Sequence, residues 1–82
     1  MYITVEISYY PLTEKYDQPV FQLLEILNSQ PEIVVEPGTM STLIRGEYDE
    51  VMSILNTGMK ELMRSYPSVF NLKIANACEL KS

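Results

Sequence analysis

The stretch YITVEISYYP, residues 2 to 11, contains the clearest structural signal in the chain. Ile3, Val5 and Ile7 occupy every second position, and polar residues separate them. Because successive side chains of a strand point to opposite faces, this alternation predicts a strand with one buried face. Pro11 has no amide hydrogen to donate to a neighbouring strand, so we expect the strand to stop there.

Apolar residues at helical spacing follow this strand. They predict a helix from Asp17 to Asn28, in which we expect Asp17 to cap free amides and Pro19 to be tolerated in the first turn. A second apolar stripe of the same period predicts a helix between Gly46, which we take as the exit from a strand, and Pro67. Further strands are expected at residues 33–36, 39–45 and 69–75. The turn signal Pro37-Gly38 joins the first two of these as a hairpin.

The predicted element order is therefore β-α-β-β-α-β. Short connections and right-handed crossovers favour one α+β solution for this order, a ferredoxin-like sandwich of two helices on a four-stranded antiparallel sheet with strand order 4-1-3-2. A chain of 82 residues is long enough for one core, so we expect a single domain over residues 1–82. The stability margin of such a small domain is thin, and a homo-oligomer is expected for that reason.

Composition excludes several classes of partner. The formal net charge is −5 and no basic cluster is present, which disfavours nucleic acid and anionic lipid. Glu6, in the middle of the exposed row of the first strand, argues further against RNA. The single cysteine, Cys78, forms no internal disulfide and is interpreted as incidental. No apolar run approaches the length of a membrane span, so we expect a cytoplasmic protein with no membrane insertion.

Residues suited to catalysis are scarce. The chain has no histidine, which removes the commonest general base and most zinc and copper sites. The acidic residues Glu47, Asp49 and Glu50 are candidate magnesium ligands, but acids at a helix start more often interact with the helix dipole. No phosphate-binding glycine pattern is present. We therefore expect no enzyme activity, no metal and no cofactor, with carboxylate catalysis as the least favoured alternative.

A candidate binding site lies at the end of the first strand. The predicted sheet brings Tyr9, Thr42, Tyr16, Gln18 and Phe70 towards one edge. Thr42 shares its predicted strand face with Met40 and Ile44, and a hydroxyl at such a position needs a partner. That partner is either a ligand or the main chain. In the second case Thr42 is an ordinary core threonine and the tyrosines form the rim of the core.

Three stretches carry a resemblance to a known family: residues 5–12 (VEISYYPL), 40–52 (MSTLIRGEYDEVM) and 72–77 (LKIANA). In these stretches the chain resembles the YkoF-related family of thiamine- and hydroxymethylpyrimidine-binding proteins. The resemblance implies a ferredoxin-like domain that binds thiamine or its pyrimidine moiety without chemistry, in salvage or transport. Some relatives carry two such domains in tandem, whereas this chain has one.

The resemblance and the candidate site together predict a ligand surrounded by Tyr9, Thr42, Ser41, Gln18 and Tyr16. Hydroxyl and amide groups suit an aminopyrimidine, the tyrosines suit its flat face, and an acidic rim suits a cationic thiazolium. Strand alternation points Ser41 away from Thr42. The alternative function is a structural or regulatory oligomer that pairs its open sheet faces, suggested by a mixed polar row of Thr4, Glu6, Ser8, Asn71 and Lys73.

Overall fold

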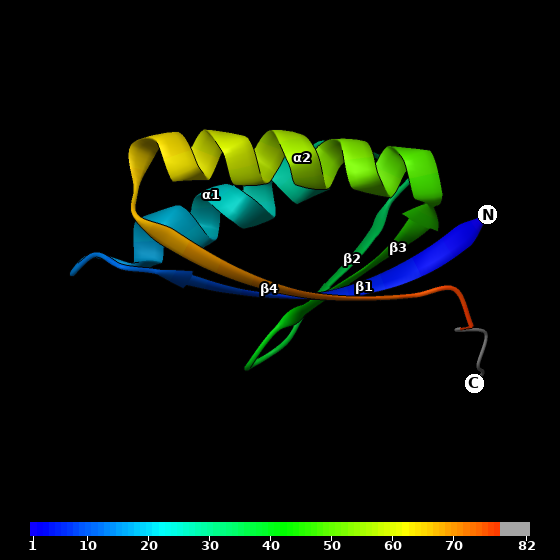
Figure 1. Cartoon of the computed structure of the whole chain (residues 1–82), viewed down its shortest axis with the longest axis horizontal. Helices are drawn as coiled ribbons and strands as arrows, with labels where there is room; N and C mark the ends of the chain where they lie inside the picture. Colours follow the sequence, from blue (N-terminus) through cyan, green and yellow to red (C-terminus); the bar gives the residue numbers. More distant parts are fainter. Residues whose placement is uncertain (78–82) are drawn as a thin grey trace.

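The computed structural model describes residues 1 to 77, in which two helices cover one face of a four-stranded antiparallel sheet (Figure 1). The elements are β1 (Tyr2–Pro11), α1 (Asp17–Asn28), β2 (Val34–Pro37), β3 (Thr42–Glu47), α2 (Tyr48–Ser65) and β4 (Ser68–Ala75). The strand order β2-β3-β1-β4 confirms the predicted ferredoxin-like sandwich. Cys78 lies outside the described residues. Within residues 1 to 77, neither helix combines the length and apolar character that crossing a membrane requires.

Strand β1 is central and supplies the middle of the core. Ile3, Val5 and Ile7 are buried, as the alternation predicted, and they face the helices. The strand pairs with β3 on one side and with β4 on the other. The opposite face of the sheet, which we call the outer face, has no helix over it (Figure 1).

The two helices pack on the sheet and against each other. The buried apolar side chains follow the predicted stripes, with Leu23 and Leu27 on α1 and Val51, Leu55 and Leu62 on α2, and Gly58 of α2 is buried as well. Gly58 lies where the helices approach closely, because a Cβ added there would stand 3.2 Å from Cγ2 of Ile26. The absence of a side chain at Gly58 therefore lets α1 and α2 pack closely.

The hairpin between β2 and β3 differs from its prediction. Strand β3 begins at Thr42, three residues later than expected, because residues 38–41 form the turn. The Gly38 amide donates to the Ser41 carbonyl at 2.8 Å and closes that turn. Met40 was predicted to share a strand face with Thr42. That prediction is wrong, since Met40 lies at the hairpin tip with 86% of its surface exposed.

Strand β1 ends at Pro11, as predicted, and Pro11 lies opposite Ser68 of β4. Two local features differ from their predictions. Tyr16, not Asp17, occupies the capping position of α1, and no side-chain hydrogen bond caps the helix. The carboxylate of Asp17 is placed to interact with the helix dipole instead. Gly46 lies buried inside β3 and is not the exit from the strand.

The close approach of the helices makes Gly58 a sensitive position. We expect Gly58→Leu to lower the free energy of unfolding by about 1–3 kcal/mol, because the added side chain overpacks the contact with Ile26. Thr57→Leu is the matched control, since Thr57 is exposed on the same helix. Urea denaturation measures both variants, and equal stabilities would contradict the packing described here.

Candidate ligand-binding site

The candidate site arises from the unequal lengths of two neighbouring strands. The pairing of β1 with β3 stops at Ile7 and Thr42, whereas β1 continues to Pro11 with only β4 beside it. The continued register would place residue 40 opposite Tyr9, but residues 38–41 have already turned away. The inner face of the sheet is therefore left without a strand beside Tyr9.

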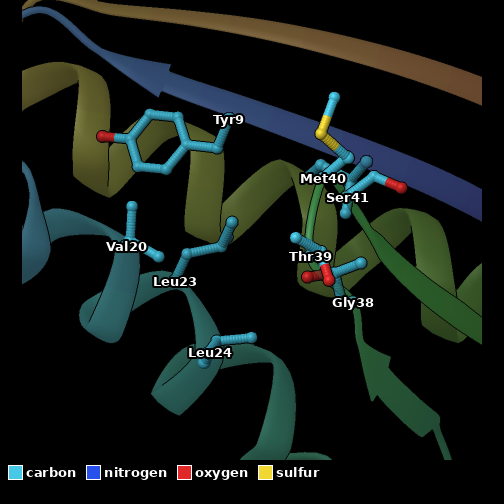
Figure 2. Close-up of a pocket in the computed structure, with 10 residues that line it drawn as sticks. Tyr9, Val20, Leu23, Leu24, Gly38, Thr39, Met40 and Ser41 are labelled. Atoms are coloured by element: carbon cyan, nitrogen blue, oxygen red, sulfur yellow. The ribbon is translucent and has the colours of Figure 1, made fainter.

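This space is a pocket of about 180 Å³, which we call the hairpin pocket. Ile7 and Tyr9 of β1 line it together with three residues of the first turns of α1, namely Val20, Leu23 and Leu24. The hairpin tip, residues 38–41, and Thr42 form the opposite wall, as Figure 2 shows for the tip. An engineered apolar cavity of about 150 Å³ holds a benzene ring. The hairpin pocket is therefore large enough for one aromatic ring.

Tyr9 is held in place from the side of β4. Its ring stacks on that of Phe70 with centroids 4.3 Å apart and an interplanar angle of 3°. Its hydroxyl lies 3.0 Å from Oγ of Ser68, and that Oγ donates in turn to the Tyr66 carbonyl at 3.0 Å. Both contacts fix the ring before any ligand arrives, which reduces the entropy that binding costs.

Thr42 lies on the inner face of the sheet, paired with Ile7 and half-buried. Among residues 1 to 77, no side-chain hydrogen bond engages its hydroxyl, in contrast to the hydroxyls of Tyr9 and Ser41. The Thr42 side chain thus presents a polar atom to the hairpin pocket with its hydrogen-bonding capacity unused. Of the two interpretations of Thr42, a contact to a ligand fits this position better than a core threonine bonded to the main chain.

Ser41 points its hydroxyl to the outer face, as strand alternation predicted. Its Oγ donates to Oε2 of Glu6 at 2.9 Å, and Nζ of Lys73 lies 3.8 Å from the other oxygen of that carboxylate. Figure 2 shows the Ser41 hydroxyl directed away from Tyr9. Ser41 therefore helps to form the wall of the hairpin pocket while its hydroxyl is engaged on the other side of the sheet.

Tyr16 and Gln18 line a separate depression, formed by residues 14–18 at the start of α1. Tyr16 is 59% exposed. The structure therefore brings together Tyr9, Ser41 and Thr42 but does not bring Tyr16 and Gln18 to the same pocket. The α1 residues that reach the hairpin pocket begin at Val20, about one turn further along the helix than Tyr16 at its capping position.

Of the residues that line the pocket, the sequence prediction missed Gly38, Thr39 and Met40 at the hairpin tip and all those of α1. Val20, Leu23 and Leu24 were recognised as an apolar stripe, but periodicity alone does not separate residues that line a pocket from residues that fill a core. Thr39 was assigned to a strand. The Pro37-Gly38 turn signal was the one available hint that the chain folds back beside Tyr9.

The hairpin pocket is electrically neutral. Every residue that lines it is apolar, a hydroxyl residue or glycine. Within the described part of the chain, no three residues among Asp, Glu, His and Cys gather where they could hold a metal ion. The pocket is thus suited to holding an uncharged ring by stacking, apolar contact and a few hydrogen bonds.

No family model matches this chain, and no curated protein matches it. A candidate thiamine biosynthesis/salvage protein of Thermotoga maritima has the same fold, with a TM-score of 0.84, 21% identity, and coverage of 100% of this chain and 90% of that one. A Streptococcus pneumoniae protein gives a TM-score of 0.87 at 24% identity, covering 99% and 92% of the two chains. A domain of unknown function (DUF77) from Bacillus cereus gives 0.75 at 19% identity, covering 100% and 82%. Identities this low show a shared fold.

The hairpin turn depends on Gly38, because a Cβ there would stand 2.8 Å from the Ser41 carbonyl oxygen. We expect Gly38→Ala to break the Gly38–Ser41 hydrogen bond and to cost about 1–2 kcal/mol of stability. The amide resonances of residues 39–42 should shift as the tip moves. Thr39→Ala, at the exposed neighbouring position, is the control. A Gly38→Ala protein with unchanged stability and spectrum would contradict the turn geometry.

Proposed function

We propose that this protein binds thiamine, or its hydroxymethylpyrimidine part, in the hairpin pocket without changing it chemically. The observation that carries the proposal is a neutral pocket, large enough for one ring, that contains a preorganised tyrosine and the free hydroxyl of Thr42. The shared fold with a candidate thiamine biosynthesis/salvage protein supports the same ligand class. The role that we propose for this binding is salvage or transport in the cytoplasm.

The chemistry of the pyrimidine fits these groups. Its ring nitrogens accept hydrogen bonds and its exocyclic amine donates them, and a threonine hydroxyl can complement either. The apolar side chains of Val20, Leu23 and Leu24 suit the ring faces. Strand β1 beyond Ile7 also lacks β3 as a neighbour, so main-chain groups beside Tyr9 are available as further partners.

The cationic thiazolium of thiamine would lie at the mouth of the pocket. The lining carries no charge to pair with it, and burial of an unpaired charge is costly. Outside the pocket the net charge of −5 favours a cation over an anion. The pyrimidine is therefore the part of the ligand that enters. Tyr16 and Gln18, in their separate depression, would contact only a part of the ligand that extends beyond the pocket.

Removal of the Thr42 hydroxyl tests the site. Thr42→Val keeps the shape of the side chain and a β-branched residue in the strand, so the fold should be retained. We expect it to weaken hydroxymethylpyrimidine binding by about five- to ten-fold, the equivalent of one hydrogen bond of about 1 kcal/mol. Isothermal titration calorimetry measures the change.

The same substitution at Thr57, which is exposed on α2, serves as the matched control and should bind like the unmodified protein. Absence of heat and of thermal stabilisation with both thiamine and hydroxymethylpyrimidine at millimolar concentration would reject the proposed function. Equal affinities of the Thr42→Val and Thr57→Val proteins would place the ligand elsewhere.

The outer face of the sheet favours a second candidate function, homo-oligomerisation through that face. It carries large exposed apolar side chains, namely Tyr2, Tyr10, Val34 and Val69. Its charges are largely paired, with Arg45 3.0 Å from Glu36 and Lys73 3.8 Å from Glu6. A mixed surface whose charges are largely paired with one another and which exposes large apolar side chains suits packing against a second copy of the chain.

A charge placed in the middle of the outer face tests this candidate. Leu43 lies there, opposite Glu6 of β1 and Glu36 of β2. We expect Leu43→Glu to shift an oligomer towards monomer, because the new carboxylate would be desolvated beside two existing acids. Phe21→Glu introduces the same charge on the exposed side of α1 and should leave the mass unchanged. A monomeric mass for the unmodified protein across the micromolar range, measured by sedimentation, would exclude the oligomer.

A further inference from the structure

The lining of the hairpin pocket combines apolar side chains with uncharged polar groups. Its available polar atoms are the hydroxyls of Thr39 and Thr42 and main-chain groups, because the Tyr9 hydroxyl lies 3.0 Å from Oγ of Ser68 and the Ser41 hydroxyl is engaged with Glu6 on the outer face. These groups are suited to an alcohol or an amine of about one ring in size. They provide no positive charge.

Proteins hold phosphate groups with a small set of devices. The usual ones are arginine or lysine side chains and the free amides at a helix N-terminus, which the helix dipole reinforces. Phosphate sites generally combine several of them.

The basic side chains of residues 1 to 77 lie elsewhere. None lines the hairpin pocket. Lys15 lines the depression at the start of α1, and Lys60 and Arg64 lie together on α2. Arg45 and Lys73 are paired with Glu36 and Glu6 on the outer face.

The nearest helix start is also poorly suited to an anion. The first turn of α1 contains the carboxylate of Asp17, which already occupies the favourable end of the helix dipole. Pro19 in the same turn has no amide hydrogen, so one of the free donors of a helix N-terminus is missing. Both residues reduce the ability of α1 to attract a phosphate group.

From this arrangement we propose that the hairpin pocket selects the free alcohol of its pyrimidine ligand and rejects the phosphate ester. The inference rests on the proposed function and specifies which form of the ligand is taken. A phosphate group in the pocket would lose hydration without gaining a charge-assisted hydrogen bond. It would also approach the Glu6 carboxylate, which lies behind the Ser41 wall. The protein therefore binds the ligand in the form that it has before phosphoryl transfer.

Paired titrations test the selection. Calorimetry with hydroxymethylpyrimidine and with its phosphate monoester, at physiological ionic strength, should give an affinity at least ten-fold higher for the alcohol. The two compounds share the ring and differ in the phosphate alone. Their affinity ratio therefore isolates the contribution of charge.

A substitution that should increase the affinity for the phosphate ester provides a second test. Met40 lines the hairpin pocket from an exposed position at the hairpin tip, so Met40→Lys adds a cation at the wall without disturbing the core. We expect this variant to raise the affinity for the phosphate ester by about ten-fold, the equivalent of about 1.4 kcal/mol, with a smaller effect on the alcohol. Met63→Lys, at an exposed position of α2, changes the net charge equally and should leave the ratio as it was.

Each result decides between the two proposals. A clear preference for the alcohol that Met40→Lys reduces and Met63→Lys does not would support the selection. Equal or tighter binding of the phosphate ester by the unmodified protein would overturn the selection while leaving the proposed function in place. Failure of both compounds to bind would overturn both.

Discussion

The register between β1 and β3 determines where the inner face of the sheet is left open. The last pair of these strands joins Ile7 to Thr42, and the Gly38–Ser41 hydrogen bond turns the chain before it can reach Tyr9. The inner face beside Tyr9 therefore lacks the side chain that a longer β3 would supply. The row of buried residues that β1 and β3 contribute to the inner face, Ile3, Val5, Ile7 and Ile44, is interrupted at this place. A fold of 82 residues gains a pocket there while its core stays intact.

The two faces of the sheet carry different kinds of polar group. The inner face contributes a stacked tyrosine and an unengaged threonine hydroxyl to a neutral pocket. The outer face contains the ion pairs of Arg45 and Lys73 and the hydroxyl contact between Ser41 and Glu6. Residues 40 and 41 line a depression on each face. The hairpin tip, like strand β1, thus borders both the hairpin pocket and the outer face, although each proposed function rests on its own observations.

Much of the fold follows from the sequence because strong local signals agree with one another. The alternation of Ile3, Val5 and Ile7, the apolar stripes of both helices and the Pro37-Gly38 turn all favour one topology. Tyr9 and Thr42 were selected correctly as neighbours, since strand order fixes that proximity. Tyr16 and Gln18 were not, because the direction of a side chain at a helix start depends on the cap. Periodicity does not specify that cap, and Asp17 did not take the capping position that its residue type favoured.

The most direct test of this account is to map where the ligand lies. In amide NMR spectra of the labelled protein titrated with hydroxymethylpyrimidine, the account predicts the largest shifts at Tyr9, at residues 38–42 and at Val20 to Leu24. Shifts confined to Tyr16 and Gln18, or to outer-face residues such as Ser8 and Asn71, would contradict the assignment of the hairpin pocket. A spectrum unchanged at millimolar ligand would contradict binding altogether.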